Sequence, residues 1–263
     1  MSVCLTCQKI RKVALLITNR KYVKKPLTNG HENSTEFAKQ LSSMGFVCSV
    51  YRDLEIADMQ LAFRTFIAGL QDNDMIVIYF TGHSKYIVDS LYNTSITPGC
   101  RISMANIFQC IRAQISRGTV LYMGDTCSSD KRNCHYGHCI PRDQKWYDKY
   151  AERDKYIITD HYGKTPQKRM TTNVTFTTLL SSEPGTATFA VGTDELFDHT
   201  AAIITYINPS VGEHVYPGQT YSINDMYAKL YAYMIKRQLQ RPYITSVGAP
   251  IYIRCPNCVK PSI

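Results

Sequence analysis

Two side chains that together can perform covalent acyl transfer each follow an apolar run of the chain. His83 comes after the apolar run 75–80, and Cys127 comes after the apolar run 119–123. Unbroken apolar runs of this length are typical of strands that are covered on both faces of a sheet. Because parallel strands end at one edge of an open sheet, we expect the two side chains to lie near each other. An imidazole beside a thiol helps to form the thiolate, which is the nucleophile.

Strands and helices alternate along the chain and would position these two residues. Apolar side chains at helical spacing, such as Phe37, Leu41 and Met44, predict helices between the strands, and a small hairpin is expected near 87–91. This alternation favours right-handed crossovers and a mainly parallel sheet. Strands are expected at 12–18, 47–51, 75–83, 119–127, 174–180 and 250–254.

Composition limits the classes of protein that fit. The chain has 263 residues, of which 44% are hydrophobic, a length suited to one α/β domain. We expect an N-terminal tail (1–11), one domain (12–254) with a polar insertion (128–172), and a C-terminal tail (255–263). No apolar run is long enough to span a membrane and no signal peptide is visible, so a cytoplasmic protein without a membrane partner is expected.

The charge and the cysteines exclude two further classes. The net charge of +9 is spread diffusely rather than along a basic stripe, so we expect no nucleic-acid partner. Ten cysteines in a chain without a signal peptide argue against a disulfide framework. No cofactor is expected.

Several motifs in a fixed order resemble the caspase-like cysteine proteases. They are Phe-Thr-Gly-His83, Gly-Asp-Thr-Cys127-Ser-Ser, and the segments 12–19, 41–46 and 180–187. The resemblance covers about residues 11–253 and is nearest to the metacaspase and paracaspase branch. It implies a three-layer α/β sandwich, in which helices cover both faces of a mostly parallel six-stranded sheet. It also implies a cysteine endopeptidase that acts on proteins or peptides, in processes such as apoptosis.

The resemblance assigns roles to individual residues. His83 and Cys127 would form the catalytic dyad, and the backbone N–H groups of Ser84 and Cys127 would form the oxyanion hole. The family usually has glycine after the histidine, so Ser84 would be strained if that position required a positive φ. The neighbouring Asp130 also replaces a frequent glycine.

The predicted substrate pocket favours basic side chains. Metacaspases and paracaspases carry an aspartate two residues before the cysteine, as Asp125 does here, which implies cleavage after Arg or Lys. A second pocket position, usually acidic in the family, is neutral in this chain, where Asn33 could still accept a hydrogen bond. Ser181 and Ser182 are expected to line the same pocket.

Two alternatives to a simple peptidase stay open. The insertion 128–172 contains many Lys and Arg residues, so a protease with basic specificity could cut itself there. Ser84, Asp130 and Asn33 also fit a weak or inactive caspase homologue that acts as a binding or regulatory protein. In either case a homodimer could form through an edge strand at 250–254.

The remaining cysteines raise the question of a metal. Cys4 and Cys7 form one Cys-x-x-Cys pair, and Cys255 and Cys258 form another at the opposite end of the chain. Four thiolates could bind one zinc ion and support an interaction module. Because the pairs are far apart in sequence, loops without metal are the preferred interpretation. The same holds for the Cys- and His-rich segment 134–139.

Overall fold

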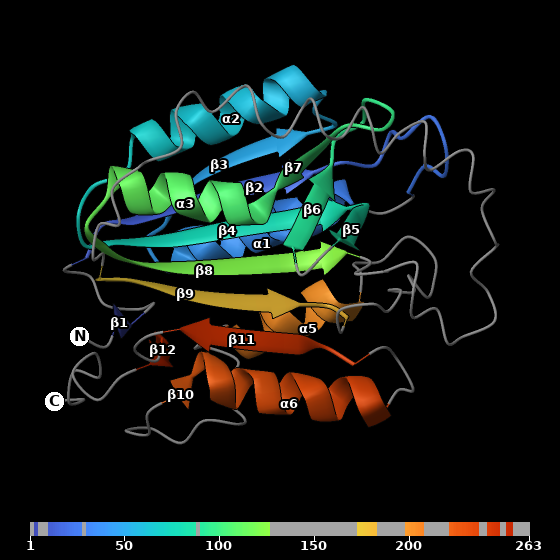
Figure 1. Ribbon diagram of the computed structural model, residues 1–263. Helices are drawn as coiled ribbons and strands as arrows, with labels where there is room; N and C mark the ends of the chain where they lie inside the picture. Colours follow the sequence, from blue (N-terminus) through green and yellow to red (C-terminus); the bar gives the residue numbers. More distant parts are fainter. Residues whose placement is uncertain are drawn as a thin grey trace, which may run out of the picture.

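A mostly parallel six-stranded sheet forms the centre of the domain (Figure 1). Its order is β11-β9-β8-β4-β2-β3, and only β11 is antiparallel to its neighbour. The strands are β2 (Lys12–Thr18), β3 (Val47–Arg52), β4 (Asp74–Gly82), β8 (Arg117–Thr126), β9 (Asn173–Leu180) and β11 (Tyr243–Val247). This computed structural model describes residues 3–4, 10–27, 30–87, 90–126, 173–182, 198–207, 221–236, 241–247 and 251–254.

The apolar runs form the central strands because both of their faces are covered. All residues of β2 and β4 are buried. By contrast, β3 lies at the edge of the sheet, and its Val47 is 71% exposed. The fold predicted from the sequence, a three-layer sandwich around a mostly parallel sheet, is confirmed.

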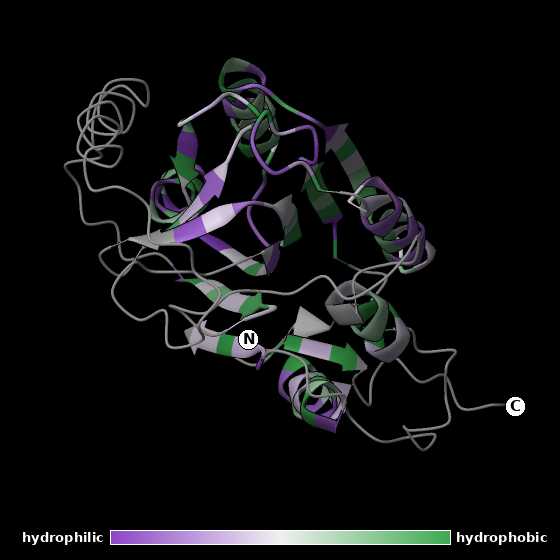
Figure 2. Ribbon diagram, turned by 90° about the vertical axis from the view of Figure 1, so that its right-hand side faces the viewer, coloured by the Kyte–Doolittle hydropathy of each residue, from purple (hydrophilic) through white to green (hydrophobic). Residues whose placement is uncertain are grey.

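Helices cover both faces of the sheet. On one face, α1 (His31–Ser43), α5 (Asp198–Ile207) and α6 (Ile223–Lys236) share a hydrophobic core with the sheet. On the other face, α2 (Ile56–Ala68) and α3 (Met104–Gln114) form a second core. Figure 2 views the molecule from the side toward which β4 and β8 point in Figure 1. In this view the helices carry both hydrophobic and hydrophilic residues.

Two small three-stranded sheets flank the central one. The first contains β5 (Ser84–Ile87), β6 (Ser90–Thr94) and β7 (Arg101–Ser103), and β5 and β6 form the hairpin expected from the sequence. The second has the order β1-β12-β10, with β1 (Val3–Cys4), β12 (Ile251–Arg254) and β10 (Tyr221–Ser222). Val3 and Cys4, in the segment expected to be a tail, therefore belong to a sheet.

The strand predicted at 250–254 is in a different place from the one expected. We expected it at an edge, where it could pair two subunits, but β12 lies between β1 and β10. Its Ile251 and Ile253 are buried in the core, 2% and 1% exposed. That expectation was wrong because the apolar pattern reports burial and does not identify the neighbouring strands. The sixth strand of the central sheet is β11, and a homodimer as such stays a prediction.

Within the described residues, no helix has the length and apolar character needed to cross a membrane.

Candidate active site

The two central strands end side by side. β4 and β8 run parallel, and their last paired residues are Gly82 and Thr126. His83 is the next residue after Gly82, and Cys127 is the next residue after Thr126. Cys127 lies outside the described residues. The strand ends that precede both predicted catalytic residues are thus neighbours, while the position of Cys127 itself stays a prediction.

Tyr22 and Thr94 hold the backbone of His83. The His83 N–H donates to the Tyr22 hydroxyl at 2.9 Å, and the His83 carbonyl accepts from the Thr94 N–H at 2.9 Å. The Tyr22 hydroxyl donates in turn to the Thr94 carbonyl at 3.1 Å. Burial raises the pKa of this hydroxyl above its ordinary value, so it remains protonated and able to donate. The ring of Tyr22 also packs on the imidazole, with centroids 4.3 Å apart.

A backbone carbonyl determines which nitrogen of His83 carries the proton. Nε2 of His83 lies 2.8 Å from the carbonyl oxygen of Lys25. A carbonyl can only accept, so Nε2 must donate, and the neutral imidazole keeps its lone pair on Nδ1. An imidazole in this tautomer can take a proton at Nδ1, and the Lys25 carbonyl then stabilises the cation that forms. This is the arrangement that a general base needs.

Lys25 adopts an uncommon conformation that directs this carbonyl. Its φ is +61°, in the left-handed region that residues other than glycine rarely enter. Lys25 also precedes Pro26, and residues before proline normally adopt extended conformations. Such a conformation costs roughly 1–3 kcal/mol and persists only where the surroundings impose it. The strain therefore lies at the residue whose carbonyl binds the imidazole.

Gly82 allows Tyr22 to approach the end of β4. Its φ is +152°, and a Cβ atom at this position would lie 2.5 Å from the Tyr22 hydroxyl oxygen. No side chain fits there without displacing the tyrosine, which itself holds His83. Glycine is thus required one residue before the histidine by both conformation and space.

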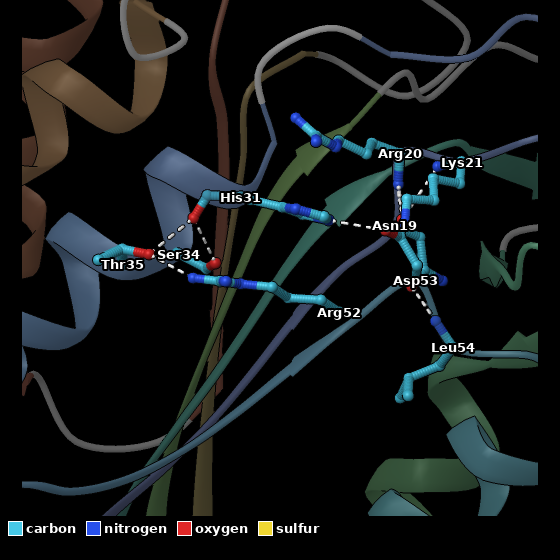
Figure 3. A network of polar contacts seen from close by, with 9 residues as sticks. All are labelled: Asn19, Arg20, Lys21, His31, Ser34, Thr35, Arg52, Asp53 and Leu54. Atoms are coloured by element: carbon cyan, nitrogen blue, oxygen red, sulfur yellow. Dashed lines mark hydrogen bonds and ion pairs between the residues drawn. The ribbon is translucent and has the colours of Figure 1, made fainter.

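Asp53, which follows β3, contacts Lys21 in the loop after β2 (Figure 3). The same loop continues to Tyr22 and Lys25. Oδ1 of Asp53 accepts from the backbone N–H groups of Arg20 at 2.8 Å and Lys21 at 3.0 Å. Burial alone would raise the pKa of this carboxyl, but the two N–H groups and nearby positive charge outweigh it and lower the pKa. The carboxylate therefore stays ionised and anchors the loop where it leaves β2.

His31, the first residue of α1, completes this network. Its Nε2 lies 3.0 Å from Oδ2 of Asp53. Burial lowers the pKa of His31 by more than the attraction of Asp53 raises it, and the charges of Arg20 and Arg52 lower it further. At neutral pH the contact is therefore made by an uncharged imidazole.

Asn19 ties the same loop to three other segments. Its backbone N–H donates to the Thr81 carbonyl at 3.0 Å, and its Oδ1 accepts from the Leu54 N–H at 2.9 Å. Its Nδ2 donates to the Thr94 carbonyl at 3.1 Å. The side chain is fully buried. The ends of β2 and β4, the segment after β3 and the hairpin strand β6 therefore meet at one amide.

A buried polar chain joins two of the predicted pocket residues. Asp125 accepts a short hydrogen bond from the Thr200 hydroxyl, which lies 2.8 Å from the Tyr79 hydroxyl. The Asn33 side chain hydrogen-bonds to Tyr79 as well. All four side chains are at most 4% exposed. Asp125 and Asn33, predicted separately from the sequence, thus belong to one polar cluster on the face covered by α1 and α5.

Ser181 and Ser182 bind the backbone just before Cys127. The Thr126 N–H donates to Oγ of Ser181 at 3.0 Å, and the same hydroxyl donates to the Thr126 carbonyl at 3.0 Å. Oγ of Ser182 also donates to this carbonyl, at 3.3 Å. Both serines are fully buried. Whatever contact they make with a substrate, they fix the last described residue of β8.

A comparison with known families and structures identifies the domain. Residues 11–247 match the caspase domain of the peptidase C14 family. The chain belongs to this family. A search of curated protein sequences gave no match.

Two crystal structures share the caspase fold with this chain. Caspase-1 from Spodoptera frugiperda has 14% identity and a TM-score of 0.59, with 93% of this chain and 90% of that chain covered. A protein from Geobacter sulfurreducens has 13% identity and a TM-score of 0.64, with 95% and 97% covered. At these identities, the likeness supports the fold alone.

The position after the histidine differs from what the family pattern suggested. Ser84 begins β5 and is 8% exposed. It is not among the described residues with a positive φ outside glycine, which are Lys25, Asp53 and Asn73. Serine in this caspase domain is therefore compatible with the backbone, and the expected strain occurs at Lys25 instead. The oxyanion role of the Ser84 N–H stays a prediction.

Sequence reasoning missed the residues that support the histidine. Tyr22 and the Lys25 carbonyl lie in a loop whose sequence indicates only a polar connection, and the sequence motifs assign no role to Asp53. The one signal in the sequence was the aspartate directly after a strand, since such residues often bind backbone N–H groups.

A metal centre receives no support from the described part of this caspase domain. No three His, Cys, Asp or Glu side chains gather there in a way that could hold an ion. Cys4 lies in β1, whereas Cys7, Cys255, Cys258 and the segment 134–139 fall outside the described residues.

Proposed function

We propose that this caspase domain is a cysteine endopeptidase in which Cys127 is the nucleophile and His83 is the general base. The observation that carries the proposal is the contact of His83 Nε2 with the Lys25 carbonyl, which favours the tautomer whose basic nitrogen is Nδ1. A histidine that served only the core would not require a strained loop to fix its tautomer.

The pairing of the strands supports the same assignment. Gly82 and Thr126 are partners in adjacent parallel strands, and such strands lie about 4.8 Å apart. His83 and Cys127 each come one residue later, and consecutive Cα atoms are about 3.8 Å apart. This backbone spacing would allow the side chains of His83 and Cys127 to come into contact.

The proposed reaction has two halves. The Cys127 thiol gives its proton to Nδ1 of His83, and the thiolate attacks the carbonyl carbon of the scissile peptide bond. The imidazolium then protonates the leaving amine as the C–N bond breaks, which leaves a thioester. In the second half, His83 takes a proton from water as the water oxygen attacks the thioester carbonyl, the C–S bond breaks, and the imidazolium returns the proton to the leaving thiolate. Backbone N–H groups of Ser84 and Cys127 would stabilise the oxyanion in both halves.

Asp125 and Asn33 would select a basic residue before the cleaved bond. Asp125 is a carboxylate in a site that excludes most water, where a charged hydrogen bond to a guanidinium or ammonium group is strong. Asn33 belongs to the same polar cluster through Tyr79 and Thr200. This supports cleavage after Arg or Lys.

Self-cleavage within 128–172 is a further part of the proposal. This segment lies outside the described residues, so its support is the number of Lys and Arg residues in it. Mass spectrometry of the wild type and of Cys127→Ala tests it. Identical fragments from both proteins would argue against self-cleavage.

The decisive experiment measures hydrolysis of fluorogenic peptides that differ only in having Arg, Lys or Asp before the reporter. We expect the wild type to cleave the Arg and Lys peptides and Cys127→Ala to cleave none. Cys48→Ala, at a half-buried cysteine in β3, is the control for loss of a thiol. A folded wild type that cleaves none of the peptides would favour the binding protein over the enzyme.

A further inference from the structure

Two buried hydroxyl groups form a hydrogen-bond chain whose protons both point toward Asp125. The Thr200 hydroxyl donates to Oδ2 of Asp125, and its oxygen lies 2.8 Å from the Tyr79 hydroxyl. A threonine hydroxyl has one proton, and Asp125 receives it, so the Thr200 oxygen must accept from Tyr79. Burial and the negative charge of Asp125 raise the pKa of Tyr79, so its hydroxyl stays protonated and able to donate. The chain therefore runs from Tyr79 through Thr200 to the carboxylate.

The fold brings these groups together from three elements. Asp125 in β8 is paired with Thr81 in β4, and Tyr79 lies two residues before Thr81, on the same face of the sheet. Thr200 lies in the first turn of α5, which packs on this face (Figure 1). All these side chains are buried, so bulk water does not solvate the carboxylate. The hydroxyl of Thr200 takes the place of a water molecule and offsets part of the cost of burial.

Hydroxyl donors suit a carboxylate whose charge acts on a ligand. A hydroxyl that donates to a carboxylate favours the ionised form, but the hydroxyl is neutral and leaves the negative charge in place. An ionised carboxylate has about four acceptor positions, and the Thr200 hydroxyl uses one of them. Because Thr200 belongs to a helix and Tyr79 to a central strand, both donors are held by regular elements. The Thr200 hydroxyl therefore fixes both the charge and the orientation of the Asp125 carboxylate.

We propose that Thr200 is a positioning residue for substrate selection: its hydroxyl, supported by Tyr79, holds the Asp125 carboxylate for an Arg or Lys side chain of the substrate. This inference rests on the proposed function, since Asp125 selects the residue before the cleaved bond there. It adds a residue from α5, a helix that contains none of the motifs of the caspase resemblance. If Thr200 only attached α5 to the sheet, its loss would affect all substrates equally.

Thr200→Val tests the proposal, because valine keeps the shape of threonine and lacks its hydroxyl. For the fluorogenic Arg peptide, kcat/KM should fall about tenfold, mainly through a higher KM, a loss near the lower end for a hydrogen bond to a charged group. For a peptide with a neutral residue before the reporter, kcat/KM should stay unchanged. The acid side of the pH profile of kcat/KM should move to higher pH for the Arg peptide alone, because the variant stabilises the charged carboxylate less.

Three matched variants make the test specific. Thr200→Ser restores the hydroxyl and should retain the preference for the Arg peptide. Thr205→Val makes the same change at an exposed position of α5, where the hydroxyl donates to the Ala201 carbonyl at 2.9 Å, and should behave as the wild type. Tyr79→Phe removes the donor to Thr200 and should weaken the same preference by a smaller factor, about threefold. This last variant also serves if Thr200→Val does not fold.

A binding measurement separates this inference from the proposed catalysis. In proteins that carry Cys127→Ala, titration calorimetry with the Arg peptide should show about tenfold weaker binding when Thr200→Val is added, and no change when Thr205→Val is added. This readout needs no hydrolysis, so a folded wild type that cleaves no peptide would refute the enzyme and leave the inference to be decided by binding. The inference is overturned if Cys127→Ala binds the Arg and neutral peptides equally, if Thr200→Val weakens both equally, or if it leaves the Arg peptide unaffected.

Discussion

Replacement of Tyr22 by phenylalanine removes one oxygen atom from the support of His83. The ring remains, so its packing on the imidazole is retained. The lost hydroxyl accepts from the His83 N–H and donates to the Thr94 carbonyl. That carbonyl still accepts from Nδ2 of Asn19 at 3.1 Å, so only the His83 N–H loses its partner.

The number of hydrogen bonds lost in Tyr22→Phe determines the expected loss of stability. A buried polar group left without a partner costs roughly 1–3 kcal/mol, and the His83 N–H is only partly buried, so we expect about 1–2 kcal/mol of lost unfolding free energy. For a domain of this size, that lowers Tm by about 2–8 °C. Because the imidazole becomes less well positioned, kcat should fall roughly tenfold, which is about 1.4 kcal/mol. KM should change little, since Tyr22 contacts the imidazole.

The assays are urea unfolding, for stability, and steady-state hydrolysis of an Arg peptide, for kcat and KM. Tyr51→Phe is the matched control, since Tyr51 is a partly buried tyrosine of β3 that packs in the core on the side of α2 and α3. The reasoning is refuted if Tyr22→Phe loses no more stability or kcat than Tyr51→Phe. It is also refuted if the whole loss of activity lies in KM.

Four further predictions concern residues of the candidate site and of the loop that supports it. Gly82→Ala should destabilise the domain by about 2–4 kcal/mol and abolish hydrolysis, because the new Cβ would lie 2.5 Å from the Tyr22 hydroxyl and the residue has a left-handed φ. Gly69→Ala is the control, since its Cβ would make only ordinary contacts, and it should leave urea unfolding almost unchanged. Because the pKa of His31 is lowered in the folded state, the unfolded chain binds a proton there first as pH falls below about 6.5. The free energy of unfolding should therefore drop between about pH 7 and the lowered pKa, and this drop should be smaller in His31→Gln. The lowered pKa of Asp53 adds a second loss below about pH 4, which a chemical-denaturation series against pH would resolve; a flat profile would contradict both. Asp125→Asn should lower kcat/KM for an Arg peptide roughly ten- to hundredfold and leave the slow cleavage of a neutral peptide unchanged. An equal loss of kcat/KM on both peptides would indicate a structural role for Asp125 instead.

The sequence was most informative where local pattern and burial coincide. The apolar runs of β2, β4 and β8 are buried on both faces, so their composition alone predicts them. The start of α6 was also predictable, since Ser222 and Asp225 cap it through two reciprocal bonds, with the Asp225 N–H 3.2 Å from Oγ of Ser222 and the Ser222 N–H 2.8 Å from Oδ2 of Asp225.

The sixth strand could not be predicted in the same way. β11 reads Tyr-Ile-Thr-Ser-Val and lies at an exposed edge, where polar and apolar residues both fit. The sequence predicts the more apolar segment 250–254 as the last strand instead, because composition reports burial and not which strands are paired.

The groups that hold His83 could not be predicted from the sequence for a different reason. Every residue has a carbonyl group, so nothing in the identity of Lys25 marks its carbonyl as the partner of an imidazole. The role depends on the left-handed conformation of Lys25, in a loop whose start is anchored by Asp53 and Asn19. Asp125 and Asn33 were predictable as residues, but their connection through Tyr79 and Thr200 joins segments far apart in the sequence.

The partner of the histidine in this domain belongs to the main chain, and this affects how the domain tolerates mutation. Lys25→Ala should have almost no effect in an alanine scan, because truncating the lysine side chain leaves the backbone carbonyl oxygen in place. Insertions or deletions between Tyr22 and the start of α1 would instead move that oxygen. A change in loop length, more than a substitution, is therefore the change that would remove the carbonyl partner of this histidine.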